Sequence, residues 1–67
     1  MDVVKVIELI GYSEDSFQDA VENAVETASK TVKNIVGVDV RRFKGSVEDG
    51  KITKYKANVK IAFVIKG

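Results

Sequence analysis

A single segment with helical periodicity stands among strand-like segments that carry apolar residues on both faces. From Glu14 to about Lys33 the apolar residues recur at spacings of three and four, which is typical of one face of an amphipathic helix. Because one helix covers only one face of a sheet, something else must cover the other face. The apolar stripe of the expected helix consists of Phe17, Ala20, Val21, Ala24, Val25, Ala28 and Val32.

Three further segments have the composition of β-strands. Residues 2–10 and 35–46 are rich in valine and isoleucine, which are favoured in strands. Residues 51–65 show the clearest alternation, because every second residue from Tyr55 to Ile65 is apolar or aromatic. The last part of this segment is apolar on both faces, which indicates burial on both sides.

The turn between the last two strands carries an Asp49-Gly50 pair, which is favoured in tight β-hairpins. Ser13 precedes the helical segment and is a candidate N-cap. The element order is therefore strand, helix, strand, strand. We predict an α+β fold of β-α-β-β order, with a three-stranded antiparallel sheet wrapped around one helix, as a single domain over residues 1–67.

The chain is too small to bury much of its own surface. It has 67 residues and neither cysteine nor histidine, so disulfides and Cys/His zinc sites are excluded. A chain of this size buries only about 60% of the surface that it exposes when unfolded. We therefore expect self-association to cover the apolar positions that the helix leaves open. These positions are Val4, Val6, Val36, Val38, Val40, Ala62 and Val64.

The charged residues are nearly balanced, with eleven basic against ten acidic side chains. The chain therefore lacks the basic excess of nucleic-acid-binding domains. The opening MDVVKV does not have the layout of a signal peptide, and no apolar run reaches membrane-spanning length. We expect a cytoplasmic protein that binds neither nucleic acid nor membranes. Without cysteine, histidine or a base motif near its serines, the chain is not expected to be an enzyme.

Three stretches together resemble the dodecin family: KVIELIGYSEDSFQDAVENAV, ASKTVKNIVGVDVRRFKG and KYKANVKIAFVI. They match the family's first strand and acidic helix start, its helix end and second strand, and its last strand. The resemblance covers essentially the whole chain. It implies β-α-β-β subunits that assemble into a hollow homododecamer and, in many members, hold flavins such as FMN or riboflavin.

The resemblance places two flavin-contacting positions at residues that depart from the family pattern. The stacking tryptophan of flavin-binding members falls at Gly37, and a glutamine that meets the ring edge falls at Lys56. Stacking on an aromatic side chain contributes roughly 1–3 kcal/mol per ring, and glycine supplies none of it. Lysine donates hydrogen bonds but cannot accept them. Both departures weaken the prediction of a flavin site, and Gly37 has the alternative interpretation of permitting a β-bulge.

Basic residues on the last two strands form the second part of the predicted site. Arg42 and Lys44 would share a sheet face with Lys56 and bind an anion, such as the phosphate of a flavin nucleotide or of coenzyme A. The alternative is a solvated face that discourages edge aggregation. Lys56 is expected opposite residue 42 or 43, with Gly37 about 15–20 Å further along. A ligand that contacts both places would therefore bind between subunits.

The carboxylate side chains indicate a different class of ligand, metal cations. Glu14, Asp15 and Asp19 crowd the helix start, and Glu48 and Asp49 lie in the hairpin turn. Compensation of the helix dipole and turn chemistry explain both groups without a metal, so no metal ligands are assigned. The predicted function is storage or sequestration of a flavin or related anionic ligand. The alternative is a structural cage without flavin that holds cations such as calcium or magnesium, as some relatives do.

Overall fold

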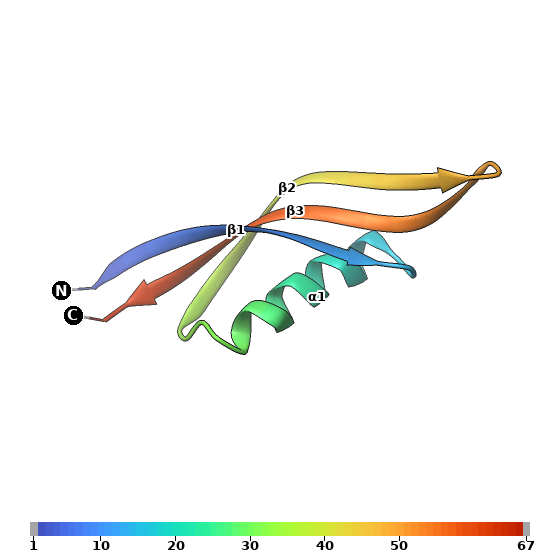
Figure 1. Ribbon diagram of the computed structural model, residues 1–67. Coiled ribbons are helices and arrows are strands. Elements are labelled where there is room, and N and C mark those ends of the chain that lie inside the picture. The colour runs from blue at the N-terminus through green and yellow to red at the C-terminus, as the bar shows by residue number, and fades with distance from the viewer. Residues whose placement is uncertain (1, 67) are drawn as a thin grey trace.

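The computed structural model describes residues 2–66 and shows one helix packed on a three-stranded sheet (Figure 1). The antiparallel strands lie in the order β1-β3-β2, so the last strand is central. The predicted α+β class and β-α-β-β order are confirmed. The elements are β1 (Val3–Ser13), α1 (Phe17–Ser29), β2 (Ile35–Glu48) and β3 (Lys51–Ile65).

The junction between β1 and α1 differs from the prediction. β1 continues through Gly11 to Ser13, and the N-cap of α1 is Ser16. The Ser16 hydroxyl accepts a hydrogen bond from the backbone N–H of Asp19 at 3.0 Å, as an N-cap does. The buried hydroxyl of Ser13 instead donates to the Asp19 carboxylate at 2.7 Å and accepts from the backbone N–H of Asp15 at 2.8 Å. The prediction of Ser13 as the N-cap is therefore wrong by one turn.

The helix ends at Ser29, earlier than the predicted Lys33. Asn34 adopts a left-handed conformation with φ of 63°, which a helix does not continue through. The backbone N–H of Val64 donates to the Asn34 carbonyl at 3.0 Å, so this turn is anchored to β3. The helix itself closes with hydrogen bonds from the Lys30 and Thr31 N–H groups to carbonyls three residues earlier, both at 3.2 Å.

Small side chains allow the helix to approach the sheet closely. A Cβ at residue 11 would overlap the carbonyl oxygen of Ala20 and lie 2.8 Å from the Ala24 Cβ. Only glycine therefore fits at this point of β1. The core cluster comprises Ala20, Ala24 and Ala28 of α1 with Ala57, Val59 and Ile61 of β3.

The β2–β3 hairpin projects beyond the end of β1 and the start of α1 (Figure 1). Asp49 and Gly50 both have positive φ, 51° and 76°, which is the pattern of the tight hairpin turn predicted from the Asp-Gly pair. The pairing register shifts between Ile35 and Gly37. A β-bulge therefore lies at this place, as the alternative interpretation of Gly37 expected.

Much of the sheet's apolar surface remains open in the subunit. Val38 and Val40 pair with buried residues of β3, and so lie on the helix side, but α1 does not cover them. Val4 and Val6 lie on the opposite face. Of the seven positions predicted to be left open, five are exposed, and the two on β3 are half-buried: Val4, Val6, Val36, Val38 and Val40, against Ala62 and Val64.

Within residues 2–66, no helix has both the length and the apolar character needed to cross a lipid bilayer.

Candidate functional site

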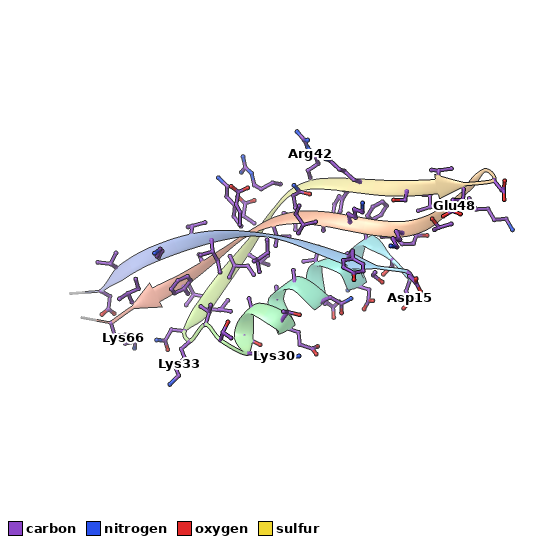
Figure 2. All side chains as sticks on the ribbon, in the orientation of Figure 1. Asp15, Lys30, Lys33, Arg42, Glu48 and Lys66 are labelled. Atoms are coloured by element: carbon purple, nitrogen blue, oxygen red, sulfur yellow. The ribbon has the colours of Figure 1, made fainter. Side chains whose placement is uncertain are left out.

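The sheet face that points away from α1, called the outer face below, carries the predicted site residues. Ala57, Val59 and Ile61 face the helix, so alternation places the even-numbered residues of β3 on the outer face. Figure 2 shows Arg42 pointing away from α1 on this side. The register arranges the outer face in rows: Val6–Ala62–Gly37, Glu8–Lys60–Asp39, Ile10–Asn58–Arg42 and Tyr12–Lys56–Lys44.

A shallow hollow of about 260 Å³ opens at Gly37. A Cβ built at Gly37 meets no atom within 4 Å, and the glycine does not have positive φ. The backbone therefore does not require glycine here, and the space exists because residue 37 has no side chain. The hollow, called the Gly37 hollow below, is lined by Val6, Gly37, Val38, Asp39, Lys60 and Ala62.

The charged groups beside the Gly37 hollow compensate one another. Asp39 accepts a hydrogen bond from the Arg41 guanidinium at 3.0 Å, and this ion pair is largely exposed. Lys60 lies between Glu8 on one neighbouring strand and Asp39 on the other. Two carboxylates thus face two cations, and the rim has no net charge. The sequence places Arg41 and Lys60 in a basic band but assigns neither them nor Glu8 and Asp39 to a site beside Gly37, because this proximity follows from the strand register.

The cations of the outer face gather at the other end of the sheet. Lys44 lies directly opposite Lys56, and Arg42 occupies the neighbouring row. The Lys54 ammonium lies 5.7 Å from the ring centroid of Tyr12, within the range of a cation–π contact. Like charges directly opposite each other destabilise a sheet. Arg42, Lys44, Lys54 and Lys56, called the cationic end below, thus concentrate positive charge at this end of the outer face.

The register places Lys56 opposite Lys44, so the predicted partner at residue 42 or 43 is wrong. The tight turn alone would pair Lys56 with residue 43. A register shift at Ser46–Val47 leaves an additional residue on β3 and moves the partner by one position. Bulges of this kind leave no clear trace in the alternation of a partly polar strand.

The predicted site residues fall in two separate places on one subunit. Gly37 lies in the hollow, whereas Arg42, Lys44 and Lys56 lie at the cationic end. Ala62, opposite Gly37, and Lys56 are six residues apart along β3, which is about 20 Å at roughly 3.3 Å per residue. A compact ligand cannot contact both places on the same chain.

A second groove of about 320 Å³ runs between β1 and α1. The Asn23 amide crosses it and donates a hydrogen bond to the Tyr12 carbonyl at 3.1 Å. The groove contains none of the predicted site residues and no charged side chain. Its lining is Leu9, Ile10, Gly11, Tyr12, Asn23, Ala24 and Thr27.

The carboxylates do not gather into a metal site within the described part of the chain. Asp19 is engaged by Ser13 and by the Asn23 amide, at 2.7 and 3.4 Å. Among residues 2–66, no group of three or more acidic side chains is arranged to hold a cation. Asp19 thus accepts hydrogen bonds at the start of α1, and compensation of the helix dipole by this acidic group stays a prediction.

The chain is similar in sequence and in fold to known proteins. A dodecin from Thermus thermophilus is 26% identical over 61 residues, which cover 91% of this chain and 88% of the relative. The solved dodecin from Streptomyces coelicolor is 30% identical, covers 98% of this chain and 94% of its own, and has a TM-score of 0.93. A calcium dodecin from Mycobacterium tuberculosis, solved with a calcium-binding site, is 32% identical, with 96% and 91% coverage and a TM-score of 0.82.

The family model confirms the resemblance seen in the sequence, since the Dodecin model matches residues 3–66. The two solved relatives share the fold over nearly their full length. The chain therefore belongs to the dodecin family.

Proposed function

We propose that this chain assembles into a hollow homododecamer that stores or sequesters a small anionic ligand, a flavin such as FMN or a related cofactor, at its subunit interfaces. The observation that carries the proposal is the division of the outer face into an apolar hollow and a cationic end about 20 Å apart. A ligand with an apolar ring and an anionic group would contact the hollow of one subunit and the cations of another.

The open apolar surface supports self-association. Val4, Val6 and Val36 are each more than half exposed. Isolated apolar side chains are common on protein surfaces, but a contiguous apolar face marks an interaction site. The proposed role is binding without catalysis, in keeping with the absence of cysteine and histidine from the sequence.

A titration with FMN and riboflavin, followed by quenching of flavin fluorescence, tests the ligand class. The two flavins differ by one phosphate. If the cationic end binds that phosphate, Lys44→Gln weakens FMN binding about 3- to 10-fold, or about 0.6–1.4 kcal/mol, and leaves riboflavin binding unchanged. Lys30→Gln, at the residue that follows the last turn of α1, is the matched control. Equal effects of Lys44→Gln on both flavins would contradict the proposed phosphate contact.

The two departures from the flavin-binding pattern give a second test. Gly37→Trp combined with Lys56→Gln restores the stacking ring and the amide, so the double variant should bind riboflavin at least about tenfold more tightly than the natural chain. No gain in a variant that still assembles would argue that residues 37 and 56 do not contact the flavin.

A cage that holds cations in place of flavin is the second candidate function. It is favoured by the similarity to the calcium dodecin. Because one subunit presents no acidic cluster within residues 2–66, such a site would combine carboxylates of several copies. Calcium titration by calorimetry separates the two functions: saturable calcium binding with no flavin quenching supports the cage.

A further inference from the structure

The Asp49-Gly50 turn at the tip of the β2–β3 hairpin places a reactive pair of residues in an open position. Both residues are exposed, and the tip projects beyond the start of α1 (Figure 1). A Cβ built at Gly50 meets no atom within 4 Å. Within residues 2–66, no backbone carbonyl accepts a hydrogen bond from the Gly50 N–H, and no salt bridge engages Asp49. The Asp49 carboxyl group and the Gly50 nitrogen are therefore free to react with each other.

An aspartate that is followed by glycine can convert into isoaspartate without an enzyme. The glycine nitrogen attacks the side-chain carboxyl carbon and forms a C–N bond. One carboxyl oxygen leaves as water, with the N–H proton and the proton of the carboxyl group, and a succinimide ring remains. Water then adds at the backbone carbonyl carbon of the ring, and the bond from that carbon to the nitrogen breaks. The main chain now runs through the former side chain, and the water lost in the first step is regained in the second.

Asp15-Ser16 is a comparable pair that the fold protects. Asp15 is also exposed, and serine is a small residue that shields its own nitrogen little. The Ser16 N–H, however, donates to the buried Ser13 hydroxyl at 3.4 Å, and the Asp15 N–H donates to the same oxygen at 2.8 Å. Ser16 is further fixed as the N-cap of α1. The Ser16 nitrogen must leave these contacts before it can attack, whereas the Gly50 nitrogen has no such contact to break.

The conformation of the hairpin tip determines what the conversion would do. Asp49 has a φ of 51°, which residues other than glycine adopt at a cost, so rotation toward the ring leaves an unfavourable conformation. Isoaspartate adds a methylene group to the main chain of a two-residue turn that depends on two positive φ angles. The neighbouring pairing is already irregular between Ser46 and Val47. The lengthened turn therefore no longer fits the register of the adjoining strand ends.

We propose that Asp49 is a site of spontaneous isoaspartate formation in the folded protein, and that this modification opens the tip of the β2–β3 hairpin. The inference goes beyond the proposed function, because it requires neither a ligand nor a catalyst. Water is the only co-reactant. The same two residues that close the hairpin thus also limit how long its tip remains intact.

Incubation of the natural protein at neutral pH in water enriched in heavy oxygen tests the reaction, because each ring opening incorporates one solvent oxygen. Trypsin separates residues 45–51 from residues 6–30, and fragmentation in the mass spectrometer localises the label. Synthetic peptides of these two segments are matched references without a fold. Asp49 should take up label within about threefold of its peptide rate, whereas Asp15 should be slower than its peptide by at least about tenfold.

Absence of label at Asp49, or equal protection of Asp49 and Asp15, would overturn the proposed site. Amide hydrogen exchange of residues 45–51 tests the opening of the tip. The fraction that contains isoaspartate, separated by chromatography, should exchange faster than fresh protein, and unchanged exchange would refute the opening. Asp49→Glu retains the charge but would need a less favourable, larger ring. Aged Asp49→Glu protein, verified as folded by circular dichroism, should therefore show neither label at residue 49 nor faster exchange.

Discussion

At the scale of single residues, two glycines in strands have opposite surroundings. Gly11 faces the backbone of α1 and leaves no room for a Cβ, whereas Gly37 faces open space. The sequence predicts that the first strand ends before Gly11 and that Gly37 is a bulge or a missing side chain, so it does not separate a close contact from open space. The distinction depends on the distance to a neighbouring element, which strand periodicity does not encode.

Replacement of each glycine by alanine measures this difference. Gly11→Ala should lower the free energy of unfolding by about 1–3 kcal/mol or more, because the helix must move away from β1. Gly37→Ala is the matched control and should leave stability unchanged or raise it by about 0.5–1 kcal/mol. Urea denaturation measures both. A Gly11→Ala protein as stable as Gly37→Ala would contradict the close helix–strand contact.

The N-cap offers a second test at this scale. Ser16→Ala removes the hydrogen bond to the Asp19 N–H and should cost about 1 kcal/mol. Ser16→Asp retains a capping acceptor and should recover most of the loss. Thermal or urea unfolding compares the three proteins, and equal stability of Ser16→Ala and the natural chain would argue against this cap.

At the scale of elements, periodicity predicted the order and type of every strand and helix but not their exact ends. The apolar stripe of α1 and the alternation along β3 are properties of the sequence itself, so both elements could be predicted from it. The turn from α1 into β2 includes the Asn34 carbonyl held by the Val64 N–H of β3, and the partner of Lys56 depends on a register shift near the hairpin tip. Both are tertiary features. The position of Lys60 and Asp39 beside Gly37 could not be predicted for the same reason, because it follows from the strand register.

The docking of α1 onto the hairpin can be tested at Phe17. Its ring lies 4.8 Å from Tyr55 and 5.0 Å from Phe43, centroid to centroid, as in favourable aromatic pairs. Phe17→Ala should reduce the free energy of unfolding by about 2–3 kcal/mol, since the ring is only partly buried. Phe17→Leu keeps most of the apolar volume and should cost less. Equal losses would show that the aromatic geometry adds nothing.

At the scale of the whole molecule, the subunit is elongated, with extents of 53 × 19 × 13 Å, and leaves a strongly apolar sheet open. Composition and binary pattern were sufficient to predict this imbalance, because they reveal how much apolar strand a single helix must cover. They could not show how copies meet. The separation of the Gly37 hollow from the cationic end by about 20 Å agrees with the proposed site between copies.

A charge placed on the open sheet should prevent assembly without unfolding the subunit. Val4 is 59% exposed in the subunit, so Val4→Glu costs little within one chain but would bury an unpaired charge in an interface. Size-exclusion chromatography with light scattering should find smaller species. Gln18→Glu adds the same charge on the helix and serves as control. A Val4→Glu protein that assembles normally would place the interface elsewhere.

The sheet of one subunit has more apolar surface than α1 covers, so we expect copies of the chain to cover the rest. Native mass spectrometry of the natural protein tests this most directly, because it reports subunit number and retained ligand together. We expect a particle of twelve chains, each of 7.3 kDa. A stable, folded species with the mass of one chain would contradict it.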